Sequence, residues 1–241
     1  MSLCRPGVSL AARTAGRPAR TADPADWPLM DSAFARAAND LDEETFQALY
    51  GQWDPLNPSQ VAELFAGSAV RWWVVGGRAA RIGAAPRPHE DTDVAVSRND
   101  LDELRDTLSG WHLWEANDGT LRPVLPGQPL SAGCEQFWMR RDAQHPWRLD
   151  LQLDASDQEW VFKRDATIRV PWPRAVQAID GVRYLRPEIA LLYKARLDRP
   201  KDRADLAAAA LDAGARSWLA ANLERLGHHE WARLASGQGA G

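Results

Sequence analysis

One stretch early in the chain constrains the fold more than any other, because an apolar run leads directly into two glycines. Residues 72–75 are typical of a buried strand, and Gly76 and Gly77 predict a turn that opens a short helix. After a loop rich in proline and arginine, a second strand is expected to open with Asp91 and Asp93. Side chains two residues apart on a strand point to the same side. The pair therefore predicts a site for a divalent cation, and oxygen ligands suit Mg²⁺.

The remaining patterns predict helices and strands on both sides of this stretch. Helices are expected at 41–50, from Asn57 through Phe65 and from Ser97 to Gly110, and short antiparallel strands at 111–116, 121–124 and 135–140. Residues 147–154 alternate, with leucines on one face and Asp150, Gln152 and Asp154 on the other, as in an ordinary half-buried strand. From Pro187 onward the pattern is helical. We therefore expect an α/β (α+β) fold, a mixed sheet flanked by helices and followed by a C-terminal helical bundle.

Composition limits the class of protein. A hydrophobic content of 45% and a charged content of 26% are those of an ordinary globular chain, and the net charge of −4 argues against a nucleic-acid partner. Cys4 and Cys134 have no neighbours at metal-ligand spacing and are interpreted as reduced thiols. No apolar run is long enough to cross a bilayer, so we expect a cytoplasmic protein without a membrane partner. Residues 1–26 are expected to be a disordered tail, or extra sequence before a true start at Met30.

The motifs in combination are more specific than each alone. The run Trp73-Val74-Val75-Gly76-Gly77, followed by Arg87-Pro88-His89-Glu90-Asp91-Thr92-Asp93-Val94, resembles the nucleotidyltransferase superfamily in its aminoglycoside adenylyltransferase-like branch. The segments 193–196 and 199–206 are similar to the C-terminal pattern of the same branch. The resemblance covers about residues 58 to 225. It implies a nucleotidyltransferase-type mixed sheet, with a catalytic domain at 27–186 and a C-terminal helical region at 187–235.

The resemblance also implies a third, distant acid that acts with the first two. Asp150 and Asp154 both lie on the polar side of one predicted strand. Asp150 is preferred because it lies within the strand where the resemblance places the acid, whereas Asp154 opens the following turn. Asp91, Asp93 and Asp150 are thus the expected metal ligands and catalytic residues, with Mg²⁺ as cofactor and ATP as substrate. Asp150 would complete a second metal site or take the proton of the acceptor hydroxyl.

A second group of residues is expected to bind the nucleotide: Gly76, Gly77, Arg78, His89, Lys194 and Lys201. The glycines would let the backbone approach the phosphates at the start of the next helix. Arg78 stands where the branch often has Trp or Ser. His89 either contacts a phosphate or caps its loop, and the two lysines either reach the triphosphate or are solvated on helix faces. Asp202 and Asp205 are interpreted as helix-capping and dipole partners.

The function implied is transfer of AMP from ATP to a hydroxyl of a small molecule, such as an aminoglycoside-like amino sugar. Two alternatives stay open. The acceptor could be a protein or a tRNA end, as in toxin–antitoxin relatives of the superfamily, or the chain could bind a nucleotide without catalysis. The sequence does not indicate an oligomeric state.

Overall fold

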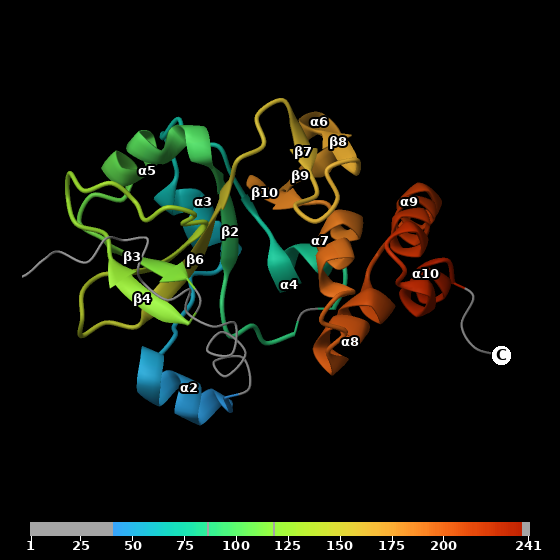
Figure 1. Cartoon of the computed structure of the whole chain (residues 1–241), viewed down its shortest axis with the longest axis horizontal. Coiled ribbons are helices and arrows are strands. Elements are labelled where there is room, and N and C mark those ends of the chain that lie inside the picture. Colours follow the sequence, from blue (N-terminus) through green and yellow to red (C-terminus); the bar gives the residue numbers. More distant parts are fainter. Residues whose placement is uncertain (1–40, 86, 118, 238–241) are drawn as a thin grey trace, which may run out of the picture.

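The fold is built on a mixed sheet of eight strands, seen in the computed structural model that describes residues 41–85, 87–117 and 119–237 (Figure 1). The expected tail at 1–26 lies outside the described residues. The strand order is β4-β3-β5-β6-β2-β1-β10-β9. The strands are β1 (Trp72–Val74), β2 (Asp93–Ser97), β3 (His112–Asn117), β4 (Thr120–Pro123), β5 (Gln136–Arg140), β6 (Trp147–Asp154), β9 (Val176–Ile179) and β10 (Val182–Leu185). A separate pair joins β7 (Glu159–Val161) to β8 (Arg169–Pro171).

Helices flank the sheet and continue beyond it, which confirms the expected fold class. They are α2 (Glu43–Tyr50), α3 (Pro58–Leu64), α4 (Gly76–Ala80), the 3₁₀ turn η2 (Arg98–Asp100), α5 (Leu101–Thr107), α6 (Trp172–Ala175), α7 (Pro187–Lys194), α8 (Pro200–Ala208), α9 (Ala213–Arg225) and α10 (His229–Ala235). Local sequence explains several starts. Asn57 and Gln60 form a reciprocal capping box at α3, and Asp42 accepts from the amide of Thr45 at α2.

One face of the sheet is apolar and covered by helices. Leu149 and Leu151 of β6 join the core there with Val61 of α3 and Leu104 of α5. Because side chains alternate along a strand, the opposite face of β6 carries Asp150 and the two polar residues after it. The predicted alternation of residues 147–154 is confirmed, and it places the polar residues on the face that α3 and α5 do not cover.

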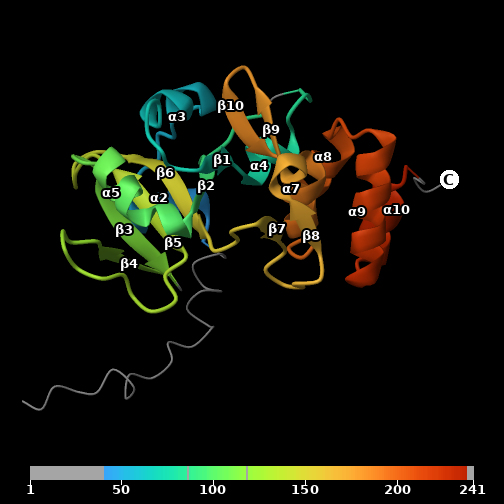
Figure 2. The same ribbon diagram turned by 90° about the horizontal axis from the view of Figure 1, so that it is seen from above.

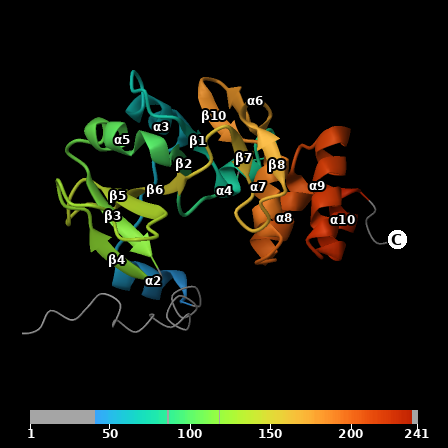
Figure 3. The same ribbon diagram turned by 45° about the horizontal axis from the view of Figure 1, so that its top comes forward.

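Among the described residues, helices and aromatic side chains cover that second face at its two ends. At one end, Trp73 of β1 packs in a core with Ala79 of α4 and Ile189 of α7. At the other end, Phe46 and Tyr50 of α2 pack against Trp138 of β5, with ring centroids 5.9 and 6.0 Å away. Figures 1 and 3 show α2 beside β3 and β4, far from the C-terminal helices. The acidic residues lie on the sheet between these two covered ends.

The C-terminal helices extend the molecule away from the sheet (Figure 2). Helix α7 packs against α4 and α9, and α10 packs against α9. In the described part of the chain, no helix combines the length and the apolar character that crossing a membrane requires.

Three expected details differ in the structure. The second strand begins at Asp93, so Asp91 precedes it. Gly76 and Gly77 form the first turn of α4 itself and not a turn before it. Gly76, the first residue of this helix, has a φ of +63°. The helix that begins at Pro187 ends at Lys194, although the helical spacing of apolar residues in the sequence continues to Leu197.

Candidate active site

The sheet places two acidic residues, Asp93 and Asp150, next to each other. They are register partners on the parallel strands β2 and β6, and the amide of Asp150 donates to the carbonyl of Thr92 at 3.1 Å. Asp154 is instead opposite Ser97, four residues farther along, or about 13 Å at the rise of a parallel strand. Of the two acids that the sequence left open, Asp150 is therefore the one beside Asp93.

Asp91 reaches the same area from the loop before β2. Between the two aspartates, the buried Thr92 turns toward the core, where its hydroxyl donates to the carbonyl of Leu56 at 2.7 Å. This anchor turns the side chains on either side of Thr92 away from the core. The guanidinium of Arg78 donates to the carbonyl of Asp91 at 3.4 Å and helps to hold this loop.

The three carboxylates carry more negative charge than their surroundings balance. Burial is the larger cause and the negative charge of Asp91 the next one, and together they raise the pKa of Asp93 to about 7. Burial raises the pKa of Asp150 well above its ordinary value, and Asp93 adds to this effect. Burial also raises the pKa of Asp91, against an opposing contribution from Lys201. A site of this kind favours a positively charged ligand.

Amide side chains hold two of these carboxylates. Gln136 donates to Oδ2 of Asp150 at 2.5 Å, and Gln152 donates to Oδ1 of Asp93 at 3.4 Å. Oδ1 of Asp150 is buried without a hydrogen-bond partner among the described residues. Such hard oxygen donors suit Mg²⁺. Within the described ranges, however, no three Asp, Glu, His or Cys side chains gather closely enough to hold a metal ion by themselves.

The two glycines allow close packing around these acids. A Cβ on Gly76 would lie 1.9 Å from Oδ2 of Asp93, and one on Gly77 would lie 2.7 Å from Nη2 of Arg87 and 3.0 Å from Cε1 of His89. Only a residue without a side chain fits at either place. Because Gly76 and Gly77 have no side chains, the side chains of Asp93, Arg87 and His89 can pack against them.

The loop before the acids is fixed to the C-terminal helices. Arg87 forms two bonds to Asp205, from Nε to Oδ1 at 2.9 Å and from Nη2 to Oδ2 at 3.1 Å, and Nη1 of Arg81 lies 3.5 Å from Oδ1. His89 lies in this loop, where burial and the charges of Arg87 and Arg78 lower its pKa to about 4. His89 is therefore neutral near pH 7 and could meet a phosphate only as a neutral donor.

Lys194 and Lys201 differ in their surroundings. Nζ of Lys194 lies 2.9 Å from Asp202 and 3.1 Å from Asp205, and its side chain is only 10% exposed. Of the two alternatives for Lys194, solvation on a helix face does not hold, because two fully buried carboxylates meet its ammonium group. Asp202 also accepts from the amide of Arg199, so its expected capping role is confirmed. Lys201 is more exposed and pairs with Glu90 at 3.2 Å.

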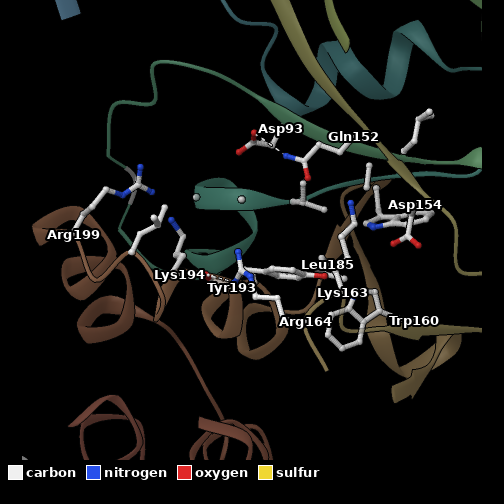
Figure 4. Close-up of a pocket in the computed structure, with 18 residues that line it drawn as sticks. Asp93, Gln152, Asp154, Trp160, Lys163, Arg164, Leu185, Tyr193, Lys194 and Arg199 are labelled. Atoms are coloured by element: carbon white, nitrogen blue, oxygen red, sulfur yellow. Dashed lines mark hydrogen bonds between the residues drawn. The ribbon is translucent and has the colours of Figure 1, made fainter. Parts of the chain in front are cut away.

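A cleft of about 360 Å³ lies beside Asp93, between the sheet and the C-terminal helices. Figure 4 shows Asp93 and Gln152 on the strand side, Lys194 and Arg199 on the side of the C-terminal helices, and Arg164 from the connection between β7 and β8. Gly76 and Gly77 also line the cleft. Arg78, His89, Asp91, Asp150 and Lys201 are not part of its lining.

Sequence reasoning missed four of the lining side chains. Gln152 could have been found, since it lies on the polar side of the same alternating strand as Asp150. Lys163 and Arg164 gave no signal, because isolated basic residues between short elements look alike whether they face a cleft or solvent. Arg199 lies in the segment 199–206 of the resemblance, but no role was assigned to it.

No protein-family model matches this chain, and a search of curated proteins found no match. Among solved structures, the fold is similar to that of ANT(2'')-Ia in complex with adenylyl-2''-tobramycin, with a TM-score of 0.38 and 13% identity over 76% of this chain and 96% of that one. The solution structure of the antibiotic-resistance factor ANT(2'')-Ia gives a TM-score of 0.36 and 14% identity, over 76% and 92% of the two chains. An antigenic nucleotidyltransferase-like protein from Paracoccidioides brasiliensis gives 0.34 and 14%, over 74% and 90%. The likeness concerns the fold.

Proposed function

We propose that this protein is a Mg²⁺-dependent nucleotidyltransferase that moves AMP from ATP to a hydroxyl group of a small molecule. The observation that carries the proposal is the side-by-side placement of Asp93 and Asp150 next to a cleft whose opposite wall presents cations. Enzymes that transfer phosphoryl groups need carboxylates to hold a metal and cations to balance the phosphates. Both requirements meet here within one cleft and its border.

The cation would be held by Asp91 and Asp93, with Asp150 as the third acid. Mg²⁺ commonly takes one or two carboxylates from a protein and completes its shell with substrate phosphates and water. The raised pKa of Asp93 and the unpartnered buried oxygen of Asp150 fit such a cation, although the three acids do not form a closed cage. When bound, Mg²⁺ would neutralise phosphate charge and help to align the groups for in-line attack.

The chain's own residues would then position the substrates and move the proton. The acceptor oxygen bonds to the α-phosphorus, the bond from that phosphorus to the α–β bridging oxygen breaks, and pyrophosphate leaves. Asp150 either completes the cation site or accepts the hydroxyl proton, and its raised pKa makes the carboxylate a stronger base. Arg164 would balance charge of the triphosphate from the opposite wall, whereas Lys194 and Arg199 would contribute only by giving up part of their contacts with buried aspartates.

The other predicted nucleotide-binding residues have more distant roles in this proposal. Gly76 and Gly77 line the cleft and leave the space that the side chains of Asp93, Arg87 and His89 occupy. Arg78 holds the loop that carries Asp91, and neutral His89 lies in that loop beside Gly77. Lys201 would reach the triphosphate only by leaving Glu90. We assign the acceptor to small hydroxyl compounds, with amino sugars as the first class to test because of the sequence resemblance.

The test incubates the purified full chain with Mg²⁺, α-labelled ATP and a panel of aminoglycosides, and follows both label transfer and pyrophosphate release. The variants Asp93→Asn and Asp150→Asn keep side-chain size and remove the charge, while Asp154→Asn is the matched control on the same strand as Asp150. We expect activity from the wild type and from Asp154→Asn, and a loss of at least about a hundredfold in the other two.

Each other outcome has a definite meaning. No label transfer and no pyrophosphate release would contradict the proposed reaction with these acceptors. If Mg²⁺ATP still raised the melting temperature in that case, the chain would be a nucleotide-binding protein without this activity. Loss of activity in Asp154→Asn but not in Asp150→Asn would reassign the third acid.

A further inference from the structure

A second cavity lies at the other end of the strands that carry the acids. Its volume is about 220 Å³, and it is bordered by the start of β1 and the end of β2. Ser97, which lines it, is four residues from Asp93, or about 13 Å along the strand. Trp72, Trp73 and Trp172 line it together with Val176, and the ring centroids of Trp73 and Trp172 are 4.6 Å apart.

Arg183 of β10 brings a charge to this cavity without a counter-charge. Its guanidinium lies over the ring of Trp72, 4.9 Å from the centroid, and its side chain is partly buried. Among the described residues, no carboxylate forms an ion pair with Arg183 and no acceptor takes a hydrogen bond from its guanidinium. Burial alone lowers the pKa of Arg183, in agreement with the absence of a nearby acid in this part of the chain.

The other arginine at the cavity is already satisfied. Arg71 donates to Asp100 at 3.0 Å from Nε and to the hydroxyl of Ser97 at 2.8 Å from Nη2, and it lies 3.6 Å from Asp157. Its carboxylate partners leave it little capacity for a further anion. Arg183 is therefore the donor that this cavity offers to a ligand, with the hydroxyl of Ser156 also at the wall.

We propose that this cavity binds a small planar carboxylate, with the carboxylate on the guanidinium of Arg183 and an aromatic ring against the tryptophans. A guanidinium fork matches a carboxylate through two parallel hydrogen bonds. One cation balances one negative charge, so a monoanion fits better than a doubly charged phosphate. The volume corresponds to roughly seven water molecules, which suits one substituted ring and is too small for a nucleotide. Trp73 lines both this cavity and the cleft beside Asp93, so the ligand would touch a wall of that cleft.

The test is calorimetric titration of the full chain with benzoate, benzyl alcohol and benzylamine, which share a ring and differ in charge. We expect benzoate to bind at millimolar concentration or tighter, and the neutral and cationic compounds to bind at least about tenfold more weakly. Arg183→Gln should weaken benzoate binding by about tenfold or more, because it removes the charged hydrogen bonds. Arg233→Gln, at an exposed arginine of α10, is the matched control and should bind like the wild type.

The ligand series keeps the test valid even if Arg183→Gln does not fold, since it uses the wild-type chain. Equal binding of benzoate and benzyl alcohol would overturn the assignment of charge. Absence of benzoate binding to the wild type, or unchanged binding to a folded Arg183→Gln variant, would overturn the site. The proposal does not depend on nucleotidyl transfer, because none of its readouts uses ATP.

Discussion

Asp93 and Asp150 occupy paired positions on two parallel strands, so the sheet itself holds two carboxylates next to each other. Ordinary folding would avoid this arrangement, because neighbouring negative charges with little access to water are unfavourable. The repulsion between these two buried carboxylates favours binding of a cation, which would neutralise them. The structure therefore keeps a local cost in the free protein that a bound ligand would relieve.

Asp150→Asn should stabilise the free protein while it removes the proposed activity. The amide keeps the size of the side chain and can still accept from Gln136, but it carries no charge to bury. We expect the free energy of unfolding at neutral pH, measured by urea denaturation without divalent cations, to rise by about 0.5–2 kcal/mol. Asp154→Asn should show no such gain, since Asp154 is more accessible. A less stable Asp150→Asn variant would contradict the idea that the buried carboxylate of Asp150 destabilises the free protein.

Gly76→Ala should be more damaging than its backbone angle alone explains. Gly67 has a similar positive φ of +78° and open space around its Cβ position, so Gly67→Ala measures the conformational cost, about 1 kcal/mol. A Cβ at Gly76 would additionally meet the Asp93 carboxylate at 1.9 Å. We expect a loss of about 2–4 kcal/mol in urea denaturation, together with loss of nucleotidyl transfer. Equal losses in the two variants would show that the contact is unimportant.

Asp205→Asn tests the connection between the loop and the C-terminal helices. The side chain of Asp205 is fully buried and meets both Arg87 and Lys194, so loss of its charge leaves Arg87 without its ion-pair partner and Lys194 with Asp202 alone. We expect a loss of about 3–5 kcal/mol in the free energy of unfolding. Asp102→Asn, which breaks an exposed pair with Arg105, should change it by less than about 1 kcal/mol. Similar values for both variants would contradict this account.

The carboxylate of Asp205 should also account for part of the loss of protein stability at acid pH. Burial alone would raise the pKa of Asp205, but hydrogen bonds from Arg87 and Lys194 outweigh it and hold the pKa below the ordinary value. A lowered folded-state pKa gives stability that is present above the unfolded pKa of about 3.9 and is lost as the pH falls through the folded value. The melting temperature of the wild type should thus fall below about pH 4, and more steeply than that of Asp205→Asn. Parallel curves would exclude this contribution.

Arg164→Gln should weaken ATP binding more than it slows the chemical step. Arg164 lines the cleft beside the ring of Tyr193, and no ion pair to it exists among the residues that the structure describes. Loss of a charged contact made equally in ground and transition states raises KM for ATP, here by about tenfold, and leaves kcat nearly unchanged. Arg174→Gln, at an exposed arginine outside the cleft, provides the control for loss of one positive charge. An unchanged KM would remove Arg164 from the nucleotide site.

The parts of the fold that the sequence predicted are those with a long repeating pattern. The alternation through Asp150 and the capped start of α3 each carry a local signal, and both were found. Residues 155–185 were not assigned, because β7 to β10 have three or four residues each, too short for alternation to be distinctive. Their pairing depends on distant strands, as in the parallel contact of Val74 with Tyr184.

The residues of the candidate site also differ in how far the sequence could predict them. The motif with Asp93 is local and could be read, and Asp150 followed from the resemblance and the strand pattern. The burial of Lys194 could not be predicted, because its environment is created by the packing of α7 on α8. The close approach of Gly76 to Asp93 was also hidden, since sequence shows that a glycine is present but not which atom fills the space beside it.

The pairing of Arg87 with Asp205 has a consequence for how the protein is made. The two residues are separated by 118 positions, so Arg87 emerges from the ribosome long before Asp205 during synthesis. During that interval the loop before Asp93 lacks the carboxylate that anchors it. The cleft can therefore reach its final shape only when synthesis has passed α8, so a nascent chain that stops earlier would display the acids without a competent site.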